Sequence, residues 1–409
     1  MKNVVYLLLA LFIVSCEKES IPIEKVKIKE TFRSGISSKK HETIVIRFTE
    51  GVSESEKNAL RVEYGVINYK ACSCGDKNLE SWDLDEFYNE ATIEERVTSM
   101  KEEPEMEGAD YDFEINISSN VPSGVVTGNV HIQDVLLKTK QEKSEIVIGV
   151  LDTGVDPSYF GFQYPFLHNS AIDNYSCSSE FFGWNFIDET NMPVDDNGHG
   201  TIVTSLIVDQ LDNSGTNFDV IPAKAFGPNG NGSLFNISCA TSYLILKKVN
   251  IINMSFGWEG ASSYIMESYI KEASQKNILI VTSAGNTGSN NDVFPHYPSS
   301  YISNNILVVT AVDNNTPPNL ILSSPSISNY GKTSVDIAVW GVGVPFYPAI
   351  GETPISITGS SYSCAKVTGY AGRLYHSDMS LSVLYHKVLD ERILANTLQY
   401  IKYKSYLDL

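Results

Sequence analysis

The stretch EIVIGVLDTG, residues 145–154, decides the fold of this chain. It is a run of apolar, mostly β-branched residues that ends in a carboxylate, Asp152, and a glycine turn. An apolar run without polar alternation is typical of a strand that is buried on both faces, as in a parallel sheet. Because the functional residues of such sheets gather at the carboxyl ends of the strands, we expect Asp152 to lie at a functional site.

Similar runs recur downstream and alternate with helical segments. We expect further strands at residues 218–226, 249–257, 277–285 and 305–313, and helices at Thr201–Leu211, Ser233–Lys248 and Ala261–Lys276. Strands of this composition, separated by helices, predict an α/β domain over residues 127–409. Its parallel sheet should carry helices on both faces.

A smaller α+β domain is expected upstream, at residues 41–117. Alternating and amphipathic segments there predict the order β-α-β-β-α-β, which is the ferredoxin-like motif. Strands are expected at residues 42–48, 67–74, 79–84 and 110–117, and helices at residues 53–66 and 91–100. Residues 118–126, SSNVPSGVV, form a linker by composition, and any processing of the chain is expected there or shortly after it.

Two further motifs supply the groups that nucleophilic catalysis beside Asp152 would need. His199 lies in DDNGHGT between two glycines that leave room for a substrate, and it is a candidate general base. Ser361 lies in TGSSYSCA, residues 358–365, at the expected start of a helix whose positive end would face the nucleophile. Ser360 is the alternative nucleophile in this string. The GxSxG motif is absent there, which counts against an α/β-hydrolase.

The order Asp152, His199, Ser361 resembles that of the subtilisin family of serine proteases. The string VTSAGN adds a fourth element, since Asn286 matches the family's side-chain donor to the oxyanion, and the Ser361 backbone N–H would be the second donor. The resemblance covers roughly residues 127–373. It implies a subtilisin-like fold and a serine endopeptidase that hydrolyses peptide bonds through an acyl-enzyme, with Asp152 orienting His199.

The resemblance also implies two walls for an extended peptide substrate. Ser255, Phe256, Gly257 and Trp258 correspond to the edge that pairs with the peptide, and Ser283, Ala284 and Gly285 to the opposite wall. Addition of a strand at such an edge supplies main-chain hydrogen bonds. The upstream domain resembles the family's inhibitory propeptide, which would make the chain a zymogen. The alternative is a permanent accessory domain.

The chain departs from the family pattern after His199 and after Ser361. Residues 201–205, TIVTS, replace the usual Thr, His, Val, Ala and Gly, and residues 362–365, YSCA, replace Met or Phe, Ala, a small residue and Pro. No catalytic atom is lost, so these changes bear first on specificity and rate. They leave open a catalytically silent lipoprotein that binds peptides in the same groove. A protease dedicated to one peptide differs from the main hypothesis only in specificity.

The first residues predict export. Met1-Lys2-Asn3 precede an apolar run, Val4–Val14, that is too short for a membrane-spanning helix but suits a signal peptide. The string IVSC, which ends at Cys16, resembles a bacterial lipoprotein box. We therefore expect residues 1–16 to be a signal, Cys16 to be lipidated, and residues 17–40 to be a tether at the cell envelope or surface. The alternative is a plain secretory signal peptide.

Charge limits the partners. The chain has 30 basic and 49 acidic residues, a net charge of −19, which argues against a nucleic acid or an anionic membrane surface as a partner. Membrane contact is expected only through the lipid. The expected partners are a peptide or protein substrate and the chain's own upstream domain, and we expect a monomer.

The remaining cysteines are Cys72, Cys74, Cys177, Cys239 and Cys364, an odd number, so at least one lies outside any intramolecular pair. Cys72 and Cys74 lack the second pair that a zinc site would need, and a structural or disulfide role is preferred. No cofactor and no metal ligand are assigned. Residues 211–222 resemble a loop that binds calcium in some relatives, where Asn213 could supply an oxygen ligand.

Overall fold

The structure is a computed structural model. It describes residues 43–86, 88, 91–117, 121, 125, 136–137, 144–160, 163–164, 166–172, 175, 177–212, 214–322, 328–348 and 353–409. The expected signal and tether, residues 1–40, lie outside these ranges together with Cys16, and so does Asn213. Among the described residues, no helix combines the length and apolar character needed to span a membrane.

The upstream domain is a four-stranded antiparallel sheet in the order β2-β3-β1-β4 with two helices. Its elements follow one another as expected: β1 (Thr43–Phe48), α1 (Glu54–Glu63), β2 (Val66–Ala71), β3 (Leu79–Leu84), α2 (Ile93–Met100) and β4 (Met106–Tyr111). Ser53 and Thr92 begin the two helices with capping boxes, each closed by a glutamate three residues later. The helices bury one face of the sheet around Trp82, which is fully buried.

The fourth strand of this domain differs from the expectation. It was expected over residues 110–117, but β4 ends at Tyr111, and Glu114–Asn116 form a separate strand, β5. β5 pairs antiparallel with β11 (Asn231–Ser233), which belongs to the α/β domain. The alternating pattern was read correctly as extended chain, but pattern alone does not say which strand is the partner.

The α/β domain is built on a nine-stranded sheet in the order β20-β21-β17-β16-β14-β12-β7-β10-β9. All neighbouring pairs are parallel except β20 and β21. The strands are β7 (Ile146–Asp152), β9 (Trp184–Asn185), β10 (Phe218–Lys224), β12 (Ile251–Met254), β14 (Leu279–Ser283), β16 (Ile306–Val312), β17 (Ile337–Trp340), β20 (Ile393–Leu394) and β21 (Ser405–Leu407). The five predicted apolar runs therefore lie side by side as β16, β14, β12, β7 and β10.

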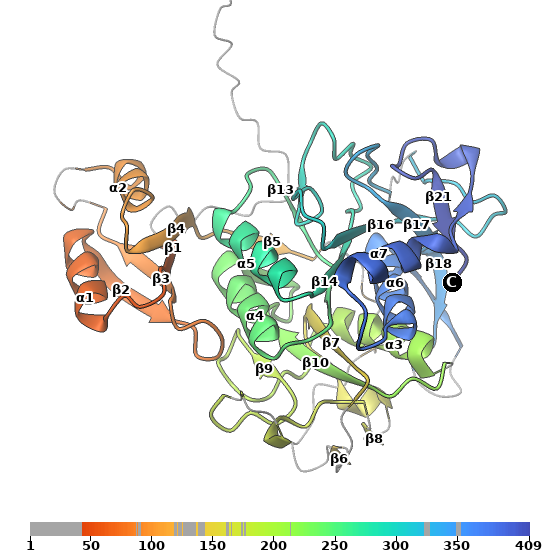
Figure 1. The fold of residues 1–409 in the computed structure, drawn as a ribbon, viewed down its shortest axis with the longest axis horizontal. Coiled ribbons are helices and arrows are strands. Elements are labelled where there is room, and N and C mark those ends of the chain that lie inside the picture. The colour runs from red at the N-terminus through yellow and green to blue at the C-terminus, as the bar shows by residue number, and fades with distance from the viewer. Residues whose placement is uncertain are drawn as a thin grey trace, which may run out of the picture. The chain divides into compact units, whose positions relative to one another are not determined.

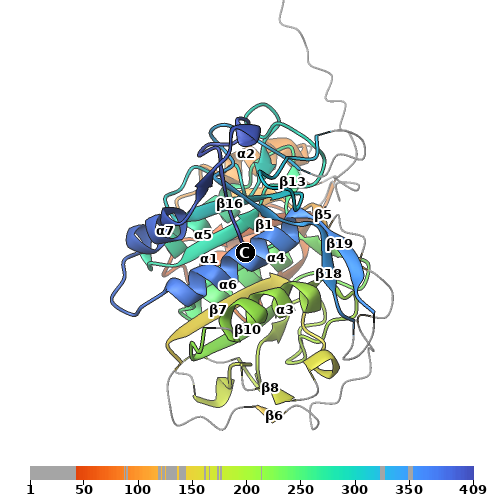
Figure 2. The ribbon, with the colours of Figure 1, turned by 90° about the vertical axis from the view of Figure 1, so that its right-hand side faces the viewer.

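Helices cover both faces of this sheet, as expected (Figure 1). They are α3 (His199–Asp212), α4 (Leu234–Leu246), α5 (Tyr264–Gln275), α6 (Ser360–Leu374) and α7 (Leu381–Asp390). Alternate residues of each strand enter two cores: Ile252 and Ile280 pack with α4 and α5, whereas Ile251 and Leu279 pack with α3, α6 and α7. Figure 2 shows α3 and α6 side by side over the sheet. The predicted α/β fold class, a mainly parallel sheet with helices on both faces, is thereby confirmed.

Short strands and turns complete the described chain. The remaining strands are β6 (Leu136–Leu137), β8 (Gln163–Tyr164), β13 (Trp258–Glu259), β15 (His296–Tyr297), β18 (Val342–Phe346) and β19 (Ile355–Thr358). Single 3-10 turns lie at Pro157–Phe160, Ser170–Ile172 and Asn396–Leu398.

Candidate active site

Asp152 and His199 form a buried hydrogen-bonded pair. Asp152 is the last residue of β7 and His199 the first of α3, and the Asp152 Oδ1 to His199 Nδ1 distance is 2.7 Å. Both residues are completely buried. Because an ionised carboxylate can only accept, Nδ1 carries the proton that is donated, and Nε2 of the neutral ring is left as the basic nitrogen.

A second buried carboxylate, Asp195, holds this pair in place. Its Oδ1 accepts hydrogen bonds from Thr153 Oγ1 (2.8 Å) and Gly198 N (2.9 Å), and its Oδ2 accepts from Thr201 Oγ1 (2.6 Å). Thr153 Oγ1 in turn accepts from Gly200 N at 2.8 Å. The residues on both sides of His199 are thus tied to the residue that follows Asp152. The motif DDNGHGT contains Asp195, but the sequence alone assigned no role to it.

Ser361 is the second residue of α6 and directly precedes Tyr362, whose ring lies next to that of His199. The ring centroids of Tyr362 and His199 are 5.9 Å apart. Ser361 Oγ donates a hydrogen bond to the carbonyl oxygen of Ser255 at 2.8 Å, and Ser255 Oγ donates to the carbonyl oxygen of Ser361 at 3.0 Å. His199 Nε2 is buried and has no hydrogen-bond partner among the described residues. The structure therefore places the serine at the site with its hydroxyl turned to Ser255.

Ser360, the alternative nucleophile, has a structural role. Its Oγ accepts a hydrogen bond from Gly285 N at 3.2 Å, and its backbone N donates to Asn286 Oδ1 at 2.7 Å. These contacts anchor the first turn of α6 to the segment that follows β14. They give Ser360 a structural role and leave Ser361 as the candidate nucleophile.

Asn286 lies beside the start of α6 in a position suited to stabilising an anion. Its Oδ1 is occupied by Ser360 N, and a Cβ atom added to Gly359 would lie 3.7 Å from its Nδ2. The backbone N–H of Ser361 belongs to the first turn of α6, where no intrahelical acceptor is available. An oxygen close to Gly359 could therefore receive hydrogen bonds from Asn286 Nδ2 and from Ser361 N.

The segment expected as the peptide-binding edge, residues 255–258, lies at the site. Its residues already contact other parts of the chain. Ser255 contacts Ser361, as described above, and Phe256 packs on Phe226 with ring centroids 4.9 Å apart. A Cβ atom at Gly257 would come within 2.1 Å of the ring of His296. Trp258 belongs to β13, which pairs antiparallel with β15.

The opposite wall also reaches the site. Ser283 ends β14, Gly285 N donates to Ser360 Oγ, and Ala284 O accepts a hydrogen bond from Asn291 Nδ2 at 2.8 Å. All three wall residues are buried. Burial also lowers the pKa of the neighbouring His296 to about 4, so that ring is neutral at physiological pH.

The strand β11 was missed by the sequence analysis. β5 pairs with it, and Ile117 N donates to Gly230 O at 2.8 Å directly before it. The only signal was the glycine-rich string GPNGNGS, residues 227–233, which is as typical of a turn as of an edge strand. Ile115 in β5 is completely buried, although it belongs to the upstream part of the chain.

The chain then continues from β5 towards His199. Val121 and Val125 are the described residues of the linker, and both lie at Gly198: a Cβ atom added there would be 2.7 Å from Val121 Cγ1 and 3.2 Å from Val125 Cβ. Gly198 directly precedes His199. Ile117 therefore lies at Gly230, and Val121 and Val125 lie at the residue before His199.

Among the described residues, the cluster with metal-ligating atoms is Cys74, Cys177 and Glu180. Cys74 and Cys177 are joined in a disulfide, so this cluster offers no thiolate to a metal ion. The carboxylates at the active site are engaged with His199 and with backbone and hydroxyl donors. Calcium binding near Asn213 stays a prediction.

Comparison with known proteins gives the same picture. The profile of the subtilase family matches residues 143–391. The thermostable alkaline protease of Halalkalibacterium halodurans is 28% identical over 312 residues, which cover 71% of this chain and 75% of that protein. The cell wall-associated protease of Bacillus subtilis is 29% identical over 251 residues, 60% of this chain but 25% of that protein. Thermitase of Thermoactinomyces vulgaris is 27% identical over 248 residues, 59% of this chain and 78% of that protein.

Proposed function

This chain belongs to the subtilase family, and we propose that it is an exported, lipid-anchored serine endopeptidase made as a zymogen. The observation that carries the proposal is the buried 2.7 Å contact between Asp152 and His199 Nδ1, which leaves Nε2 unpartnered beside the start of α6. The serine-protease relatives support a serine-type hydrolase that acts on peptide bonds.

The reaction starts from a change at Ser361. Rotation of its side chain exchanges the hydrogen bond to Ser255 O for one to His199 Nε2, a replacement of one hydrogen bond by another that costs about 1 kcal/mol or less. His199 Nε2 takes the hydroxyl proton as Oγ attacks the scissile carbonyl, and Asp152 stabilises the imidazolium that forms.

The oxyanion forms next to Gly359. Asn286 Nδ2 and the Ser361 backbone N–H then donate to it, and His199 passes its proton to the leaving amine as the acyl-enzyme forms. Water, activated by His199 in the second half of the reaction, releases the acyl group from Ser361. The donors are held in place beforehand, because Ser360 N fixes the amide of Asn286 from the opposite side.

The upstream domain acts in this proposal as an intramolecular inhibitor. Support comes from the pairing of β5 with β11 and from the contacts of Val121 and Val125 with Gly198, the residue before His199. His199 is completely buried and Ser361 is 3% exposed, which supports a site that is closed to substrate in the unprocessed chain. A permanent accessory domain is the alternative.

Self-processing tests the proposal directly. Residues 17–409 are exported to an oxidising compartment, and the chain is examined for a cut between residues 118 and 143 by amino-terminal sequencing. We expect a cut in the wild type, none in Ser361→Ala or His199→Ala, and a cut in the matched control Ser360→Ala. Labelling of the processed protein with a fluorophosphonate, under reducing conditions, should depend on Ser361 in the same way.

The catalytically silent, peptide-binding lipoprotein is the competing function. It is favoured by one observation, the engagement of Ser361 Oγ with Ser255 instead of His199. Absence of both self-cleavage and labelling, with the upstream domain removed by another protease, would establish this alternative. Export and lipidation are tested separately by metabolic labelling with a fatty acid in the wild type and in Cys16→Ala.

A further inference from the structure

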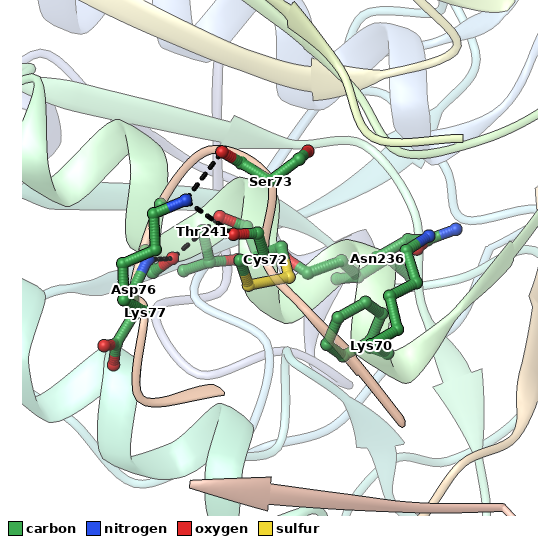
Figure 3. The surroundings of a disulfide bond; sticks show 12 residues. Lys70, Cys72, Ser73, Asp76, Lys77, Asn236 and Thr241 are labelled. Carbon is green, nitrogen blue, oxygen red and sulfur yellow. Dashed lines mark hydrogen bonds between the residues drawn. A yellow bond between two sulfur atoms is a disulfide. The ribbon is translucent and has the colours of Figure 1, made fainter. Parts of the chain in front are cut away.

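Two disulfides join the upstream domain to the peptidase domain. Cys72, directly after β2, is bonded to Cys239 in α4, and Cys74, in the turn before β3, is bonded to Cys177. Figure 3 shows Cys72 and its neighbours Ser73 and Lys77 against Asn236 and Thr241 of α4. In each bridge one cysteine lies before residue 118 and the other after residue 143.

We infer that the upstream domain is a covalently tethered inhibitor, whose release requires reduction of both disulfides in addition to cleavage of the chain. The inference rests on the proposed function. Any cut between residues 118 and 143 separates the two domains in sequence but leaves them joined through four sulfur atoms. A noncovalent propeptide can diffuse away after such a cut, whereas this one cannot.

Noncovalent contacts hold the tethered domain on the peptidase domain. Arg47 in β1 crosses to α5: its guanidinium bonds Glu272 at 2.7 Å and lies 4.0 Å from the ring centroid of Tyr269. Asp76 of the upstream domain pairs with Arg47 at 3.1 Å and accepts a hydrogen bond from the Tyr269 hydroxyl at 2.9 Å. Asp110 in β4 accepts hydrogen bonds from Ser263 Oγ at 2.8 Å and from the backbone at the start of α5.

An apolar contact surrounds these polar groups. Val45 and Leu79, which face away from the helices of the upstream domain, share one buried cluster with residues of α4 and α5 such as Phe235 and Ile265. The contact is therefore packed like a protein interior. Because the disulfides keep the two domains joined, the local concentration of the upstream domain is in about the millimolar range. The domain therefore rebinds before substrate can take its place.

The two bridges differ in how accessible they are to a reductant. Cys72, Cys74 and Cys239 are at most 2% exposed, whereas Cys177 is half-buried. The Cys74–Cys177 bridge is therefore the more accessible of the two to a reductant, since both cysteines of the Cys72–Cys239 bridge are buried. Either bridge alone is enough to keep the domain attached, so release requires both to be reduced.

The chemistry needs an external dithiol. One thiolate of the dithiol attacks a bridge sulfur, the S–S bond breaks, and the other cysteine leaves as a thiolate and takes up a proton. The second thiol of the reductant then displaces the first cysteine from the mixed disulfide. Each bridge takes up two electrons and two protons, and each dithiol is oxidised to its own disulfide.

Retention of the domain is tested without catalysis. A recognition sequence for a site-specific protease is placed at residues 128–133 in the Ser361→Ala chain, and the protein is cut and diluted to nanomolar concentration with or without dithiothreitol. We expect the upstream fragment to stay with the peptidase domain until the dithiol is added. In the variant that lacks all four bridge cysteines, replaced by alanine, it should be lost at least tenfold faster than in the oxidised parent.

Matched variants assign the bridges. Cys72→Ala/Cys239→Ala and Cys74→Ala/Cys177→Ala each keep one bridge and should retain the fragment. Equal retention by the oxidised and the reduced parent would overturn the inference, as would loss of the fragment from the oxidised parent. If the variants fold poorly, peptide mapping of the parent under non-reducing conditions still tests the inference. Bridge cysteines found as free thiols would overturn the tether.

Activity is measured in the same cut chain with Ser361 restored. Before the dithiol is added, the cut chain should hydrolyse a fluorescent casein at less than one tenth of the rate that it reaches after reduction. Full activity of the oxidised cut chain would overturn the inhibitory tether. Loss of the fragment on reduction without any hydrolysis would instead count against the proposed function, while the tether itself would stand.

Discussion

The hydroxyl of Ser361 donates its hydrogen bond to the carbonyl oxygen of Ser255, at 2.8 Å, while His199 Nε2 has no partner among the described residues. Asp152 and His199 are thus already hydrogen-bonded to each other, whereas the Ser361 hydroxyl is bonded elsewhere. Geometry of this kind is common without substrate, because catalytic hydrogen bonds often tighten only in the complex.

Replacing Asn286 by Asp should remove an oxyanion donor without disturbing α6. The new carboxylate can still accept from Ser360 N, as Oδ1 does now at 2.7 Å, but it has no N–H to offer. We expect kcat of the processed enzyme to fall by about a hundred- to a thousandfold, the range known for the corresponding donor of subtilisin itself. Asn290→Asp, four residues downstream, is the control, and steady-state kinetics on a peptide provide the measurement. An unchanged kcat in Asn286→Asp would remove Asn286 from the mechanism.

Tyr362, which departs from the family pattern, should support the ring of His199. It is completely buried and lies 5.9 Å from that ring, so Tyr362→Ala should lose about 3–5 kcal/mol of unfolding free energy and at least tenfold in kcat. Tyr362→Phe keeps the ring and should therefore keep kcat near that of the wild type.

A second buried tyrosine of α6 separates support of His199 from general packing. Tyr370→Ala should lower the free energy of unfolding to a similar extent but leave kcat near that of the wild type. Urea titration and kinetics on the processed enzyme give the two quantities. Equal kcat values for Tyr362→Ala and Tyr370→Ala would argue against a specific contact with His199.

Stability should fall in mildly acidic solution because of His296. Burial lowers the pKa of its ring from 6.5 to about 4. Between these values the unfolded chain binds more protons than the folded chain, so the free energy of unfolding decreases as the pH falls through this window. The total loss should approach about 3 kcal/mol below pH 4, at about 1.4 kcal/mol per pKa unit.

Urea titrations at pH 7.5, 5.5 and 4.5 measure the slope of the free energy of unfolding against pH. His296→Gln should flatten it, whereas His376→Gln, at an exposed position, should leave it as in the wild type. A slope that is the same in His296→Gln and wild type would show that other groups cause the acid sensitivity.

Cys364 should be an inert thiol in the folded protein. It is the free cysteine among the described residues, and burial raises its pKa to about 12. In residues 17–409 we expect no thiol to react with iodoacetamide under native conditions and one per chain to react in denaturant without reductant. Cys364→Ser should abolish the second signal. More than one reactive thiol in denaturant would contradict the pairing of the other four cysteines.

Much of the α/β domain and its site could be predicted from local sequence. Apolar runs such as residues 146–152 are nearly sufficient to identify parallel strands, and the glycines around His199 and before Ser361 mark turns that a strand end or helix start requires. Asp195 could not be recognised in this way, because its role depends on donors that lie on both sides of it in space.

The sequence by itself determined the types of the main elements and the fold class, and it predicted Asp152, His199 and Ser361 as catalytic residues, since each depends on a short pattern of neighbouring residues. Only the tertiary structure decided that β5 pairs with β11, that Cys72 and Cys74 are bonded to Cys239 and Cys177, and that the Ser361 hydroxyl faces Ser255. These contacts join residues 100 or more positions apart. No local pattern encodes such a partner, because it is selected by how the packed helices and sheets bring distant surfaces together.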